Sequence, residues 1–270
     1  MNKFSDLLLR AGTAIVGAAI ILFCCAYNEW TVLFMAMIIM IFSIREFVRL
    51  ADLPKALIIW SYVVSIIICT LFFAIAFDHL DSEFIYLLLP LSFIGLFVQL
   101  FQKGDRPLRS MALHFLGLGY ITAPMCLLFL LAQDNNGFQY VYLIGLFILT
   151  WCMDSGGYFA GSAFGRHKLI ERVSPKKSWE GTFGGLILVA IGAYVLSLYF
   201  DELTTWQWIL AGMVTGILGL CGDLVESYMK RVAERKDSGT SLPGHGGFLD
   251  RFDSLFFAIP FYLALIKFLT

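Results

Sequence analysis

The residues best suited to chemistry lie toward the C-terminal end of the chain, in residues 223–254. Carboxylates, a hydroxyl and a lysine recur there at i, i+3, i+4, i+7 and i+11, so they share one face of a predicted helix. These residues are Asp223, Glu226, Ser227, Lys230 and Glu234. Carboxylates beside cations at the mouth of a helix are suited to a phosphate-bound divalent cation, because Mg²⁺ prefers oxygen ligands.

A glycine-rich turn follows this predicted helix. Residues 242–247 read Leu-Pro-Gly-His-Gly-Gly, which cannot be helical, and such glycines allow backbone N–H groups to point at an anion. Asp250, Asp253 and Ser254 then begin another apolar run. The alternative is an ordinary loop whose basic residues contact lipid headgroups. That alternative does not account for three aspartates placed at helix ends.

A second polar stretch lies between residues 154 and 181. Asp154 interrupts an apolar run, and an acid at membrane depth indicates a functional site. Lys176 and Lys177, flanked by Ser174 and Ser178, precede the next apolar run, and cations beside a helix N-terminus favour phosphate binding. The alternative for the two lysines is anchoring of the chain at the membrane surface.

Long apolar runs must position these residues. Of 270 residues, 59% are hydrophobic and 14% charged, whereas a soluble domain has about 25% charged residues. About 20 apolar residues span a bilayer, and nine such runs predict an all-α polytopic integral membrane protein. The runs cover residues 8–27, 29–44, 56–77, 84–101, 111–132, 139–158, 181–200, 205–225 and 251–269. The six cysteines lie in or beside these runs and are interpreted as small apolar residues, without disulfides.

The loops predict the orientation. Connections that carry Lys or Arg alternate with connections that carry neither, so the N-terminus is expected in the cytoplasm and the C-terminus outside. The chain is interpreted as one membrane domain, 1–270. Residues 1–150 form a hydrophobic helical scaffold, and residues 151–270 form a catalytic half with cytoplasmic loops 166–180 and 226–249.

Residues 227–253 resemble the signature of the phosphatidate cytidylyltransferases, also called CDP-diacylglycerol synthases. That pattern runs Ser-x-x-Lys-Arg, Lys-Asp, Pro-x-His-Gly-Gly and Asp-Arg-x-Asp at fixed spacing. The matching residues are Ser227, Lys230, Arg231, Lys236, Asp237, Pro243, His245, Gly246, Gly247, Asp250, Arg251 and Asp253. Residues 174–181 are similar to another segment of that family, with Ser178 in place of Thr. Ser162 stands where the family often has a basic residue.

The resemblance implies an enzyme of phospholipid biosynthesis in the cytoplasmic (inner) membrane, with its active site facing the cytoplasm. It would join CTP, or dCTP, to phosphatidate and release pyrophosphate. It implies Mg²⁺, with K⁺ or another divalent cation as an optional second ion, and a homodimer. No nucleic-acid partner is expected.

The resemblance also assigns residues to roles. Asp223 and Asp250 would hold the metal, and Asp250, Asp253 and Lys230 are the expected catalytic residues. The expected substrate-binding residues are Ser227, Arg231, Lys236, Asp237, His245, Gly246, Gly247, Arg251, Lys176 and Lys177. The two lysines at 176 and 177 would meet the phosphatidate headgroup, and the His-Gly-Gly segment would line the triphosphate.

Two other classes of function are compatible with parts of the sequence. A small secondary transporter would explain Asp154 and its glycines, but the halves show no repeat and the polar residues gather at one membrane face. A related CTP-dependent lipid enzyme, such as a polyprenol kinase or an archaeal ether-lipid cytidylyltransferase, is a closer alternative. The full signature favours phosphatidate.

Overall fold

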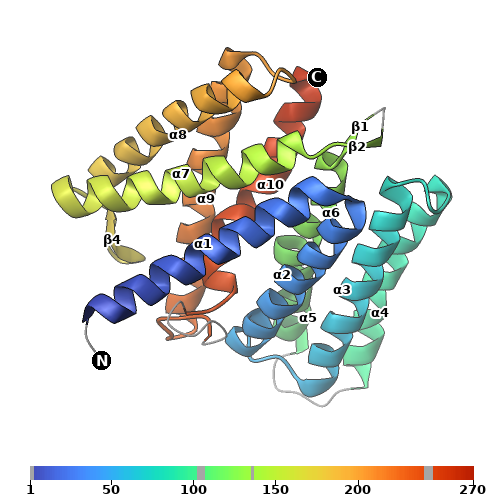
Figure 1. Cartoon of the computed structure of the whole chain (residues 1–270). Coiled ribbons are helices and arrows are strands. Elements are labelled where there is room, and N and C mark those ends of the chain that lie inside the picture. Colours follow the sequence, from blue (N-terminus) through green and yellow to red (C-terminus); the bar gives the residue numbers. More distant parts are fainter. Residues whose placement is uncertain (1–2, 102–106, 135–136, 240–245) are drawn as a thin grey trace.

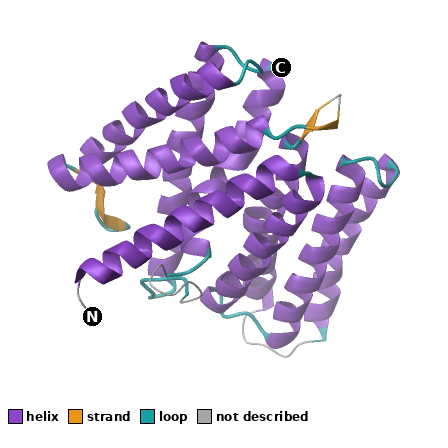
Figure 2. Cartoon of the chain, in the orientation of Figure 1, coloured by secondary structure: helices purple, strands orange, loops and turns teal. Residues whose placement is uncertain are grey.

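The computed structural model describes residues 3–101, 107–134, 137–239 and 246–270, with side chains from Gly12 onward. The described chain is helical almost throughout, with two small hairpins (Figure 2). The helices are α1 (Lys3–Tyr27), α2 (Glu29–Leu50), α3 (Lys55–Ala76), η1 (Ser82–Leu87), α4 (Leu88–Leu100), α5 (Pro107–Gly117), η2 (Leu118–Thr122), α6 (Ala123–Leu131), α7 (Val141–Phe164), α8 (Trp179–Tyr199), α9 (Thr205–Val232) and α10 (Leu249–Leu269). The antiparallel hairpins pair β1 (Gln133–Asp134) with β2 (Gly137–Phe138), and β3 (Lys168–Ile170) with β4 (Ser174–Ser178).

Within the described residues, eight helical segments are long and apolar enough to cross a membrane. They are α2, α3, η1 with α4, α5 through α6, α7, α8, α9 and α10. The described apolar part of α1 is shorter, Gly12–Tyr27. Helices satisfy their backbone hydrogen bonds internally, as hydrocarbon requires. The prediction of an all-α polytopic membrane protein is confirmed, and these eight segments with α1 correspond to the nine predicted runs.

Several helices extend beyond the apolar runs that predicted them. The second run was predicted to end at residue 44, but α2 continues to Leu50 and carries Glu46 within its last turns. Likewise α9 continues to Val232, so residues 226–232 of the predicted loop 226–249 are helical. The reason is physical: a charged residue ends the hydropathy signal, whereas the backbone hydrogen bonds of a helix can continue through it.

Close packing of glycines brings the C-terminal helices together. Helix α7 packs along α8, α8 contacts α9, and α9 packs along α10, which also contacts α2 and α6 of the N-terminal half. A Cβ atom added to Gly156 of α7 would lie 2.7 Å from the carbonyl oxygen of Gly184 on α8. Glycine is therefore required there, as in other membrane helix pairs that meet through small residues.

The polar segments gather toward one end of the molecule. In Figure 1 the beginning of α1, strand β4 and the chain leading into α10 lie toward one end. The β1–β2 hairpin and the C-terminus lie toward the opposite end. All six cysteines are free in the structure. The two motif-bearing stretches, far apart in sequence, therefore meet at the same end of the helical bundle.

Candidate active site

A large cavity with two chemically different walls lies between α1, α2, α7, α10 and the start of α8. Its volume is about 1230 Å³. One wall is apolar and comes from α1 and α2, including Ile20, Ile21, Phe34, Ile38 and Ile39. The other wall is charged, and its charged residues are Asp154, Lys176, Lys177, Asp223, Asp250, Arg251 and Asp253. The cavity therefore suits an amphiphile that carries a charged headgroup and apolar chains.

Asp223 joins the two motif-bearing stretches. It projects from α9, and its carboxylate forms an ion pair with Lys177 of β4. The Ser227 hydroxyl, one turn further along α9, donates to Asp223 Oδ1 at 3.2 Å. The Asp223 side chain is 30% exposed. It is therefore oriented by its neighbours and still accessible from the cavity.

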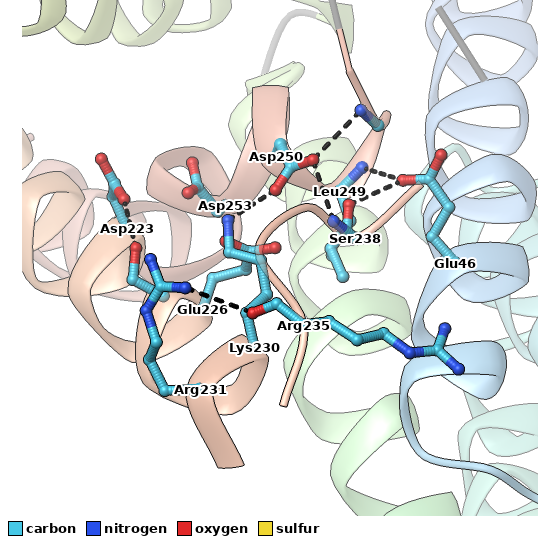
Figure 3. Close-up of polar contacts among 12 residues, drawn as sticks. Glu46, Asp223, Glu226, Lys230, Arg231, Arg235, Ser238, Leu249, Asp250 and Asp253 are labelled. Carbon is cyan, nitrogen blue, oxygen red and sulfur yellow. Dashed lines mark hydrogen bonds and ion pairs between the residues drawn. The ribbon is translucent and has the colours of Figure 1, made fainter. Parts of the chain in front are cut away.

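Asp250, in the first turn of α10, is held from several sides (Figure 3). Its Oδ2 atom accepts the backbone N–H groups of Ser238 at 3.2 Å and Gly247 at 3.1 Å. Its Oδ1 atom lies 2.5 Å from Lys230 Nζ, and the same ammonium forms an ion pair with the fully buried Glu226. Charge-assisted hydrogen bonds of this kind are the strong ones, so the position of this carboxylate is well defined.

Asp253 lies one turn after Asp250 and is only 6% exposed. Its Oδ1 atom accepts the backbone N–H of Ser254 at 2.6 Å, and its electrostatic neighbours include Asp223, Glu226 and Asp154. Gathering several acids in one place is unfavourable unless cations neutralise them. Within the described residues, however, no group of three or more His, Cys, Asp or Glu side chains is arranged to hold a metal ion.

The structure separates the predicted substrate-binding residues into two sets. Lys176, Lys177 and Arg251 line the cavity. By contrast, the Arg231 guanidinium donates to the backbone carbonyls of Val173 and Arg235, each at 3.3 Å, and is not part of the cavity wall.

The remaining predicted residues lie mainly in the chain between α9 and α10. Lys236 and Asp237 are exposed and lie outside the cavity lining. Gly246 has φ +84°, a conformation that favours glycine, and the N–H of Gly247 is directed at Asp250. His245 lies outside the described residues.

Two further carboxylates outside the cavity wall hold segments that carry site residues, and neither was predicted to do so. Glu180, in the first turn of α8, accepts the backbone N–H groups of Arg166 and His167 at 3.2 Å and lies 2.6 Å from His167 Nδ1. It thereby ties the start of the β3–β4 hairpin to α8, beside the two lysines. The signal in the sequence was the position of Glu180 at the beginning of an apolar run, where an acid favours a helix N-terminus.

Glu46 of α2 is the second carboxylate that sequence reasoning missed. It is 1% exposed, and its Oε2 atom accepts the Ser238 hydroxyl at 3.1 Å and the Leu249 N–H at 2.8 Å. The bond to Ser238 spans 192 positions of sequence. Glu46 stands between Arg45 and Arg49 just after an apolar run. The sequence therefore predicted a basic loop at this position and no site residue.

The apolar spans and the charged cavity at their end define a multi-pass membrane protein with a site suited to phosphates. The family model described as "Cytidylyltransferase family" matches residues 8–269. The chain therefore belongs to the cytidylyltransferase family.

Relatives agree with this membership. The chain is 30% identical to a phosphatidate cytidylyltransferase of Staphylococcus haemolyticus, over 93% of this chain and 96% of that protein. It is 45% identical to the phosphatidate cytidylyltransferase of Haemophilus influenzae, over 44% of this chain and 43% of that protein. It is 35% identical to the phosphatidate cytidylyltransferase of Staphylococcus epidermidis, over 64% and 65% of the two chains.

Proposed function

We propose that this chain is a phosphatidate cytidylyltransferase, which converts CTP and phosphatidate to CDP-diacylglycerol and pyrophosphate in phospholipid biosynthesis. The observation that carries the proposal is the two-walled cavity, in which an apolar surface from α1 and α2 faces carboxylates and cations from β4, α7, α9 and α10. The names of the relatives support the same substrates.

In the proposed reaction, a phosphate oxygen of phosphatidate attacks the α-phosphorus of CTP. The bond between that phosphorus and the bridging oxygen to the β-phosphate breaks, and pyrophosphate leaves. The nucleophile is already anionic near pH 7, so no strong general base is required. The principal difficulty is to bring two polyanions together, and positioning with charge neutralisation supplies most of such catalysis.

The cations of the cavity wall are suited to that neutralisation. Lys176 is exposed to the cavity and Arg251 lines it from the beginning of α10, so we assign them to the phosphates of the two substrates. Lys177 is paired with Asp223 and Lys230 with Asp250. These two lysines hold the carboxylates in place, and their positive charges would attract an entering phosphate.

The carboxylates of the cavity wall are also the type of ligand that Mg²⁺ prefers. This ion is usually bound by one or two carboxylates together with substrate phosphates and water, so it needs no cage of three protein ligands. Asp223 and Asp250 line the same cavity from neighbouring helices, with Asp253 beside them. We assign Asp223 and Asp250 as the ligands; when bound, the ion would neutralise phosphate oxygens. A second ion, a homodimer and the use of dCTP remain predictions of the resemblance.

The proposed orientation places this site at the cytoplasmic face of the inner membrane. The basic connections of the sequence alternate with connections that lack Lys and Arg, which supports a cytoplasmic N-terminus. A site at that face would receive CTP from water and phosphatidate from the adjacent leaflet.

The test uses detergent-purified full-length protein with phosphatidate, Mg²⁺ and CTP labelled at either the α- or the γ-phosphate. We expect label from the α-phosphate, and not from the γ-phosphate, in chloroform-soluble lipid. Label from the γ-phosphate alone would make the protein a lipid kinase. If neither label enters any lipid phosphate or alcohol, counterflow of labelled substrate in vesicles would test for a transporter.

A further inference from the structure

Glu46 is a buried carboxylate without an ion-pair partner among the described residues. Its Oε2 atom accepts two hydrogen bonds, while Oε1 has no partner within the described part of the chain. A carboxylate in a membrane-spanning helix is costly, and a buried polar group of this kind requires an explanation. The contacts of Glu46 with residues near the beginning of α10 explain its burial.

The Glu46 side chain lies against the chain on both sides of residues 240–245. Before that segment it binds the hydroxyl of Ser238, and after it the N–H of Leu249 (Figure 3). A Cβ atom added to Gly239 would lie 2.5 Å from Glu46 Oε1. A Cβ atom added to Gly247 would also collide with the Glu46 carboxylate. Glycine at these two positions is what lets the backbone approach so closely.

Residues of the same two segments also hold Asp250. The residue whose hydroxyl binds Glu46, Ser238, donates its N–H to Asp250 Oδ2, and Gly247, packed against Glu46, donates its N–H to the same atom. The carboxylates of Glu46 on α2 and Asp250 on α10 are thus both in contact with Ser238 and Gly247, which lie on the two sides of residues 240–245. A change in the Glu46 side chain would therefore be transmitted to Asp250 through Ser238 and Gly247.

We propose that Glu46 is a positioning residue for the cytidylyl-transfer site, because its carboxylate fixes the two backbone N–H groups that orient Asp250. The inference rests on the proposed role of Asp250 at that site. Glu46 itself is not part of the cavity wall, so it acts through its neighbours, with no direct contact to substrate.

The test compares Glu46→Ala, Glu46→Gln and Ser238→Ala in full-length protein purified in detergent. The matched control is Glu29→Gln, a partly buried carboxylate in the first turn of the same helix. Values of kcat and of KM for CTP and phosphatidate are measured per amount of folded protein, quantified by size-exclusion chromatography. We expect Glu46→Ala to lower kcat about tenfold or more while both KM values change by less than about threefold.

Two features separate positioning from a purely structural role. Glu46→Gln retains an oxygen that accepts the Leu249 N–H, so we expect it to recover most of the kcat. The loss caused by Ser238→Ala should be smaller in the Glu46→Ala background than in the native background, because residues that act as one unit are not additive. If Glu46→Ala does not fold, the same cycle is measured with Glu46→Met, which fills a similar volume but has no oxygen to accept the Ser238 hydroxyl and the Leu249 N–H.

Additive losses in that cycle, or a kcat for Glu46→Ala equal to that of Glu29→Gln, would overturn the inference. Asp250→Asn is measured in the same assay to distinguish a failure of the role of Glu46 from a failure of the proposed site. If Asp250→Asn is inactive while the cycle is additive, only the role of Glu46 fails. If Asp250→Asn has native activity, the proposed site itself fails.

Discussion

Lys177 of β4 forms an ion pair with Asp223 of α9. This pair connects the Ser-Pro-Lys-Lys-Ser segment to the aspartate that begins the polar face of α9, two regions separated by the whole of α8. The β3–β4 hairpin is anchored to α8 by Glu180 and by the Ser178 hydroxyl, which accepts the N–H of Gly181 at 3.2 Å. The position of the lysine is therefore set by its local fold as well as by its partner.

Removing this lysine charge is expected to impair turnover. Lys177→Gln leaves Asp223 without its cation and removes one positive charge from the cavity wall. We expect kcat/KM to fall about 100-fold, and Lys177→Arg to recover part of it, because the guanidinium keeps the charge but not the geometry. Lys168→Gln, an exposed lysine of β3 outside the cavity, is the control. Equal activity of the two Gln variants would contradict the role assigned to Lys177.

The apolar wall of the cavity makes a separate prediction about the lipid substrate. Gly17 of α1 lines the cavity, and a Cβ atom there would meet nothing within 4 Å. Gly17→Leu should therefore occupy cavity space and raise the KM for long-chain phosphatidate about threefold or more, while the KM for CTP stays the same. Gly12→Leu is matched, because Gly12 is on the same helix, equally open and outside the cavity lining. An unchanged lipid KM in Gly17→Leu would show that the acyl chains lie elsewhere.

The buried pair between Glu226 and Lys230 predicts an effect on stability. Glu226 is fully buried, and its carboxylate pairs with Lys230. Breaking a buried ion pair costs about 3–5 kcal/mol, and because Lys230 keeps Asp250 as a partner we expect Glu226→Gln to lie at the lower end of that range. The change should appear as a lower apparent Tm in detergent. Glu234→Gln, an exposed carboxylate after the end of α9, should have no such effect.

Removal of divalent cations should reversibly stop the reaction. Asp223 and Asp250, the proposed ligands, line the same cavity, and one or two carboxylates together with substrate phosphates are the usual ligands of Mg²⁺. We expect EDTA to reduce incorporation of labelled CTP to background and added Mg²⁺ to restore it. Native activity after exhaustive chelation, verified by elemental analysis of the protein, would contradict the metal assignment.

The sequence was sufficient to predict the fold class, and it singled out the charged residues that line the cavity, though not its apolar wall. Apolar runs of bilayer length predicted the helices, and the helical spacing of Asp223, Ser227 and Lys230 predicted their common face on α9. The ends of helices were less predictable, since α2 and α9 continue through charged residues. Hydropathy detects apolar residues, and these last turns carry buried charged residues, Glu46 on α2 and Glu226 and Lys230 on α9.

Contacts between distant segments could not be predicted from spacing. The hydrogen bond from Ser238 to Glu46 joins α2 to the chain before α10, and no local pattern identifies such a partner. The same holds for Arg231, which was assigned to substrate phosphates from its place in the motif but donates to the carbonyls of Val173 and Arg235. Its assignment as a substrate-binding residue stays a prediction.

The role of the α9 and α10 carboxylates in cytidylyl transfer is tested by measuring Mg²⁺-dependent incorporation of α-labelled CTP into lipid by Asp223→Asn and Asp250→Asn. Each variant keeps the shape of the side chain and removes its negative charge, and each is compared with native protein at equal amounts of folded material. We expect both variants to fall to background while eluting as native protein does. Native rates in both would show that the carboxylates of α9 and α10 do not carry the reaction.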